Sequence, residues 1–137
     1  MSCKSLISVA TTTSSSVLAG GTLPLATIVR RRGCDVNLSG STVALTDTGS
    51  NFYLVNVTAT FTAPVAGVVS LALQQNGTAV PGATASTTVT TAATEVRSLS
   101  FAAIVRTFNG SAIDALSVVN TGVAATFTNI AVSVVKL

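Results

Sequence analysis

Alternation between apolar and polar side chains is the feature that most restricts how this chain can fold. From Tyr53 to Thr62 the odd positions are apolar, and from Asn56 onward the even ones are Asn or Thr. A period of two residues is that of a β-strand with one buried face. No stretch of ten or more residues shows the 3.6-residue period of a helix, and Val, Thr, Ile, Ala and Phe are common. The sequence therefore predicts an all-β protein.

Turn dipeptides separate the expected strands. Asn76-Gly77 readily supplies the positive φ angles of a tight turn, and it lies inside a predicted hairpin over residues 65–80. Pro81-Gly82 predicts a second turn, and residues 83–94 are rich in β-branched side chains and predict a strand or an edge loop. Asn109-Gly110 predicts a further turn.

Two later segments carry the remaining strand patterns. Residues 95–106 are predicted to place one set of apolar side chains on a single face: Leu99, Phe101, Ala103 and Val105. Residues 124–135 are apolar on both sides, with Ile130, Val132 and Val134 on one face and Phe127, Ala131 and Val135 on the other. A strand of this kind is central in its sheet or touches another subunit. Strands at this spacing predict an all-β sandwich or a jelly roll.

The first forty residues are less regular, so we expect an N-terminal arm over residues 1–40 and a jelly-roll domain over residues 41–137. The arm holds two candidate strands, residues 6–10 and 25–30. Its apolar start is marginal for a secretory signal, and no run reaches the roughly 18 apolar residues of a membrane span.

The two cysteines, Cys3 and Cys34, leave two states open. A disulfide would tie the arm to the domain. Two cysteines make no disulfide framework, however, and thiols are the usual state of cysteines in a protein made in the cytosol. The sequence therefore favours two thiols.

Composition weakens every enzymatic interpretation. The chain has no His, and its two Cys and four carboxylates are far apart and match no ligand spacing. We therefore expect no enzyme, no metal site and no cofactor. Only 8% of the residues are charged, whereas the surface of a small soluble domain carries roughly 25–35% charged residues. We expect copies of the same chain to cover part of this surface.

One charge cluster stands out: Arg30, Arg31 and Arg32. It is interpreted either as a solvated turn after the strand at residues 25–30 or as a contact with an acidic partner surface, because guanidinium groups bind carboxylates and phosphates in a fork geometry. No basic stripe and no stacking aromatic residues accompany it, so nucleic acid is not the expected partner.

Four short motifs follow one another in an order found in a known family. They are Asp47-Thr48-Gly49, Phe52-Tyr53 with the alternating strand after it, the segment 73–82 with its Asn-Gly and Val-Pro-Gly turns, and the C-terminal strand ending at Leu137. This order resembles the trimeric C-terminal domain of collagen-like Bacillus spore-coat glycoproteins, in the complement and tumour-necrosis-factor jelly-roll superfamily. The Gly-X-Y stalk of that family is absent here. Stand-alone domains of this kind also resemble phage head-fibre, capsid-decoration and tail-tip proteins.

The resemblance implies a homotrimeric structural virion protein, either a capsid decoration or a head-fibre subunit, assembled in the host cytoplasm. Its arm is expected to contact the capsid through Lys4, Arg30, Arg31 and Arg32. The side chains expected in the core or in trimer packing are Tyr53, Val55, Val57, Phe61, Leu99, Phe101, Phe127, Ile130 and Val132.

Two alternatives remain open. One is a tip module that binds a host surface or glycan, for which Tyr53 is the candidate exposed aromatic residue, although its alternation with Val55 favours the core. The other is a spore or cell-surface layer protein. We expect neither nucleic acid nor a membrane as a partner.

Overall fold

The computed structural model describes residues 5–46, 50–107 and 113–137, and the regular elements there are all β-strands. The strands are β1 (Leu6–Thr11), β2 (Ser15–Val17), β3 (Thr27–Arg32), β4 (Val36–Ser39), β5 (Thr42–Leu45), β6 (Phe52–Thr62), β7 (Gly67–Gln75), β8 (Thr78–Val89), β9 (Arg97–Arg106), β10 (Asp114–Asn120) and β11 (Ala125–Lys136). The predicted all-β class is confirmed. Within these ranges no helix is long and apolar enough to cross a membrane.

Several sequence predictions fall on other parts of the chain. Cys3, Lys4, the Asp47-Thr48-Gly49 motif and the Asn109-Gly110 turn all lie outside the described residues.

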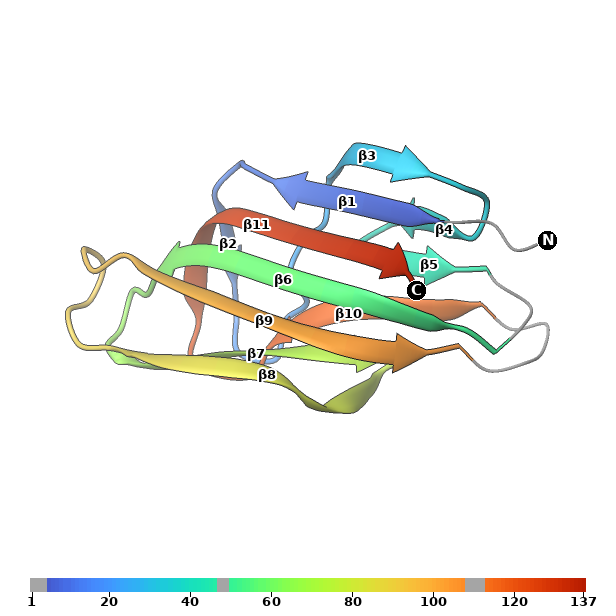
Figure 1. Cartoon of the computed structure of the whole chain (residues 1–137). Helices are drawn as coiled ribbons and strands as arrows, with labels where there is room; N and C mark the ends of the chain where they lie inside the picture. The colour runs from blue at the N-terminus through green and yellow to red at the C-terminus, as the bar shows by residue number, and fades with distance from the viewer. Residues whose placement is uncertain (1–4, 47–49, 108–112) are drawn as a thin grey trace.

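The strands form two antiparallel sheets that pack face to face (Figure 1). Sheet A has the order β3-β1-β11-β6-β9. The sixth strand, β2, pairs with residues 125–127 at the start of β11, whereas β1 pairs with residues 130–135 of the same strand. Sheet B has the order β4-β5-β10-β7-β8. The predicted β-sandwich is thus confirmed, and β11, apolar on both sides, lies in the middle of the order β3-β1-β11-β6-β9.

The core fills the space between the sheets with the inward positions of each strand. On β6, the alternating residues Tyr53, Val55, Val57, Ala59 and Phe61 are all buried, as their period of two predicts. Of the nine side chains expected in the core or in trimer packing, all but one belong to this core, and Phe101 packs against it while partly exposed.

One predicted face of β11 is wrong. Phe127 does not lie opposite Ile130 but shares its buried face, because Thr128 is an extra residue in the pairing of β11 with β6. A bulge of one residue reverses the alternation. The ring of Phe127 therefore packs in the core against Phe61, with ring centroids 5.4 Å apart.

The predicted hairpin is confirmed as β7 and β8, with Asn76 and Gly77 at φ 55° and 80° in its turn. Pro81-Gly82, however, is not a turn. It lies within β8, where residues 80–83 form a bulge between the pairs Ala72↔Thr84 and Gln74↔Ala79. Pro is tolerated there because β8 is an edge strand.

The described residues of the expected arm form strands of both sheets. β1 lies between β3 and β11 inside sheet A, and β4 pairs with β5 in sheet B. The strand expected at residues 25–30 begins only at Thr27, because the hydroxyl of Thr11 donates to Pro24 O (2.7 Å) and accepts from Ala26 N (3.1 Å), which holds the preceding segment as a loop.

The expectation of two thiols is wrong for Cys34, which is disulfide-bonded. Cys3 is the other cysteine of the sequence. The fold brings the segments next to both positions together, since the hydroxyl of Ser5 accepts a hydrogen bond from Asp35 N at 3.3 Å. The pairing of β1 with β3, which the sequence does not reveal, makes this meeting possible.

Candidate functional site

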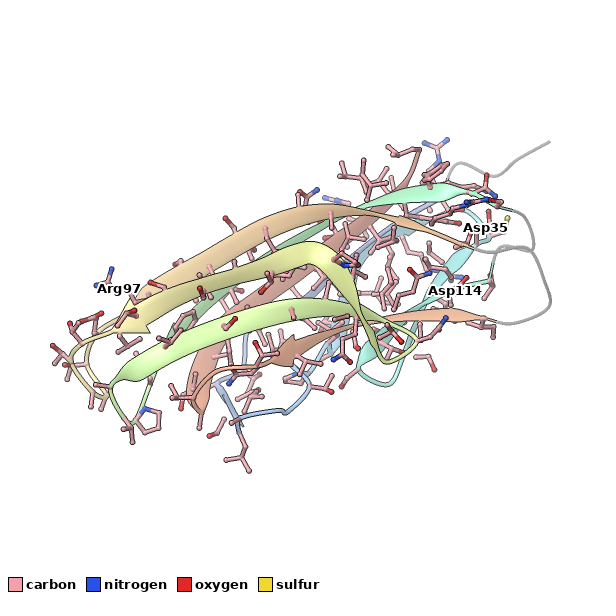
Figure 2. The ribbon with its side chains drawn as sticks, turned by 90° about the horizontal axis from the view of Figure 1, so that it is seen from below. Asp35, Arg97 and Asp114 are labelled. Carbon is pink, nitrogen blue, oxygen red and sulfur yellow. The ribbon has the colours of Figure 1, made fainter. Side chains whose placement is uncertain are left out.

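Charged side chains gather at the two ends of the elongated sandwich. Figure 2 shows Asp35 and Asp114 at one end and Arg97 at the other. The outward positions of the inner strands of sheet A, between these ends, are apolar, hydroxyl or amide side chains. A sheet face without charge is unusual for a surface in water, so the outward face of sheet A is the first candidate for an interaction surface.

Four large apolar side chains form one row across the outward face of sheet A. The strand register pairs Ile104 with Leu54, Leu54 with Val135, and Val135 with Leu6. Paired residues on neighbouring strands point to the same face of a sheet. Ile104 is 58% exposed and Val135 37%. We call Leu6, Leu54, Ile104 and Val135 the apolar row.

The neighbouring rows of the same face hold small uncharged side chains. One row runs Ala102, Asn56, Ser133 and Ser8, and the next runs Ser100, Thr58, Ala131 and Ala10. On the other side of the apolar row, the exposed ring of Phe52 lies under the guanidinium of Arg106, 5.9 Å from the ring centroid. Small side chains let another surface approach closely, and charge is confined to the rim of this face.

The outward face of sheet B differs. It shows Ser70, Ala72 and Gln74 on β7, and Thr84 and Ser86 on the neighbouring edge strand β8. One large apolar side chain on this face of β7, Val68, is 48% exposed. This face is uncharged as well, but it has no row of large apolar side chains.

Arg30, Arg31 and Arg32 lie within β3, so the interpretation of the cluster as a turn is wrong. All of β3 is exposed, and the strand forms one edge of sheet A. The register places Arg30 beside Ser8 and Arg32 beside Leu6 on the outward face. Between them, the Nε–H of Arg31 donates to Val36 O on β4 at 2.8 Å.

The three described carboxylates each have a structural partner. Asp35 Oδ2 lies 2.8 Å from the buried Nζ of Lys136, and Asp114 Oδ1 accepts from the amide of Asn76 at 2.8 Å. Hydrogen bonds from Arg97 and then from Thr90 lower the pKa of Glu95 from 4.5 to about 2. No group of three or more metal-ligating side chains occurs in residues 5–46, 50–107 and 113–137.

A shallow hollow lies beside the β7–β8 hairpin. It is lined by Gln75, Asn76, Thr78, Ala79, Val80 and Pro81. The side chains that line it are amide, hydroxyl and apolar. Tyr53, the candidate exposed aromatic residue, is fully buried and belongs to the core.

None of the four side chains of the apolar row is among the residues expected in the core or in trimer packing. The residues expected to serve core or trimer packing point inward, and the apolar row occupies alternate positions of the same strands. The signal was present in β6, where Leu54 interrupts the polar positions. The four side chains are recognised as one patch only when the strand register is known, because the row joins residues from both ends of the chain.

Comparisons with known proteins agree on the fold. No protein-family model and no curated protein matches the sequence. Among solved structures, murine APRIL at pH 5.0 is similar with a TM-score of 0.68 and 18% identity, covering 98% of this chain and 99% of that one. The globular domain of zebrafish complement 1qA protein has a TM-score of 0.63 and 13% identity, covering 95% of each chain.

A third similar structure is the vertex protein P5 of PRD1. Its TM-score is 0.62 at 14% identity, and the match covers 100% of this chain and 99% of that one. Identities this low establish a shared fold alone, and the matches cover 95–100% of each of these chains.

Proposed function

We propose that this chain, whose fold is the jelly roll of TNF-family and complement C1q domains, is a homotrimeric structural subunit of a virion surface. In this proposal it is a capsid decoration or head-fibre subunit of a bacteriophage. The outward face of sheet A packs against the other two copies, and the end of the sandwich that carries β3 attaches to the particle.

The apolar row is the observation that carries this proposal. Burial of the exposed 58% of a side chain such as Ile104 contributes roughly 1–2 kcal/mol. Four such side chains lie side by side, and small uncharged neighbours let another copy pack closely over them. TNF and C1q domains of this fold are trimeric, which supports three as the number of copies.

The distribution of charged side chains supports attachment through the end of the sandwich that carries β3. The strand register and the Lys136–Asp35 pair place five basic side chains toward the end that carries Asp35 and Asp114: Arg30, Arg31, Arg32, Arg106 and Lys136. Among the described residues, basic side chains thus outnumber acidic ones at this end. Three copies around one axis would present this excess together, and an acidic particle surface complements it. The similarity to a vertex protein over the whole chain supports a virion as that particle.

Electron microscopy of particles from the culture that makes this protein tests the role. An antibody raised against the purified protein should label the capsid exterior at regular positions. Label on a spore coat or cell envelope, with bare virions beside it, would contradict the virion assignment. Preadsorbing the antibody with purified protein should abolish the label and is the matched control.

A further inference from the structure

The outer edge of β3 is an open strand edge. β3 pairs with β1 along one side, and no described strand lies along its other side. All six of its residues are exposed. An edge of this kind presents backbone N–H and C=O groups to which another extended segment can add.

The side chains on this edge select the segment. Arg30 and Arg32 point to the same face, two residues and therefore about 6.7 Å apart along the strand. Neither arginine forms an ion pair with a carboxylate in the described parts of the chain, where the ion pairs are Arg97–Glu95 and Lys136–Asp35. The two guanidinium groups thus face solvent at the repeat distance of a β-strand.

A second copy of β3 does not fit this edge. Six guanidinium groups would lie along one pair of strands, and like charges on neighbouring strands repel. The rest of the chain offers no acidic strand either, since its four carboxylates are at positions 35, 47, 95 and 114 and no two are alternate neighbours. The observations therefore favour an acidic segment of a different protein.

We propose that the outer edge of β3 adds an extended acidic segment of a partner protein as a further strand of sheet A. Carboxylates at alternate positions of that segment bind Arg30 and Arg32 in charge-assisted pairs, and its backbone completes the ladder. Arg31 contributes less, since its Nε–H already donates to Val36 O. This inference deepens the attachment step of the proposed function and rests on it for the setting of the partner.

A nucleic acid backbone would also be attracted by the arginines, but it does not use the rest of the edge. A strand-like peptide satisfies backbone donors and acceptors as well as the guanidinium groups. β3 has no aromatic residue on which a base could stack. The open ladder therefore favours a peptide.

A labelled peptide with the sequence Thr-Glu-Val-Glu-Val-Thr tests the proposal by fluorescence anisotropy with the full-length protein. A second peptide, Thr-Glu-Pro-Glu-Val-Thr, has the same charge but lacks one backbone N–H and resists the strand conformation. A single-stranded oligonucleotide is the third probe. The protein variants are Arg30→Ala with Arg32→Ala and, as the control at the other end, Arg97→Ala.

We expect the first peptide to bind the wild-type protein, and the double variant to weaken binding about tenfold or more. Arg97→Ala should leave binding within about twofold, because exposed charges beyond the Debye length of about 8 Å are screened. The proline peptide should bind at least about tenfold more weakly. Amide exchange at residues 27–32 should slow only in the presence of the first peptide.

Equal binding of both peptides, or stronger binding of the oligonucleotide without slower exchange, would overturn the proposal, as would no binding at all. The molecular mass measured in the same buffer separates this failure from that of the proposed function. A trimer that does not bind the peptide refutes the strand addition alone, whereas a monomer that binds it refutes the homotrimer. All substituted arginines are exposed, so unchanged melting curves serve as the check on folding.

Discussion

The two outward faces of the sandwich have similar composition and different organisation. Both are free of charge over their central strands. On sheet A, Leu6, Leu54, Ile104 and Val135 meet in one row, whereas Val68 on sheet B lies among hydroxyl and amide side chains. Low charge is common to both faces, so it does not tell them apart. The strand register does, because it gathers large apolar side chains on sheet A alone.

The largest expected effect comes from breaking the apolar row. Leu54→Asp with Ile104→Asp places two carboxylates where other copies should pack, and burying an unpaired charge costs several kcal/mol. We predict that the mass in light scattering falls from three chains to one while the melting curve still shows a folded protein.

The matched control for this variant lies on sheet B. Val68→Asp changes a side chain of similar exposure on the face that we assign to solvent, so the mass should stay at three chains. A protein that loses its assembly through Val68→Asp and keeps it through the sheet A variant would reverse the assignment of the two faces.

The next largest effect is a loss of folding stability from a substitution beside sheet B. A Cβ at Gly122 would clash with the backbone of β7 at Val68 O and Ser70 N, atoms that cannot move without opening the strand. Gly122→Ala should therefore cost about 3 kcal/mol or more of unfolding free energy in denaturant titrations. The neighbouring Thr121→Ala loses one exposed hydrogen bond to Ser70 O and should cost less than about 1 kcal/mol.

A smaller effect is expected at the hairpin turn of sheet B. Asn76 accepts from Ala115 N and donates to Asp114 Oδ1, both at 2.8 Å, and thus fastens the turn to β10. Asn76→Gly keeps the positive φ angle but loses these bonds, so we predict a loss of about 1–3 kcal/mol with the trimer intact. An unchanged midpoint of denaturation would show that the side chain contributes nothing beyond its φ angle.

The smallest effect depends on pH. The pKa of Glu95 is lowered to about 2, so its ion pair with Arg97 contributes stability that is fully present above pH 4.5 and is lost as the pH falls toward 2. The melting temperature of Glu95→Gln should therefore lie slightly below that of the wild type at pH 6 and approach it at pH 2. The pair is at the surface, so the difference is small.

Much of the fold was predictable because inward positions alternate along single strands. The buried face of β6 and the turn at Asn76-Gly77 follow from local sequence. Local sequence did not predict the positions of Phe127 and of Pro81-Gly82. Each depends on a bulge, which is a property of a pair of strands. The same holds for β1, a short apolar segment whose place inside sheet A is set by pairing with β11.

The candidate site was predictable only in part for the same reason. Arg30, Arg31 and Arg32 were visible as the one charge cluster, but their place on an open edge strand required the structure. The apolar row was not visible, since Leu6 and Val135 are neighbours in sheet A and lie near opposite ends of the sequence.

The molecular mass of the wild-type protein at micromolar concentration tests the central claim most directly. Light scattering or native mass spectrometry should give three times the chain mass of 13.6 kDa. This mass should not change with salt, because the apolar row contains no charge. A mass of one chain under these conditions would contradict the assignment of the outward face of sheet A as the contact between copies.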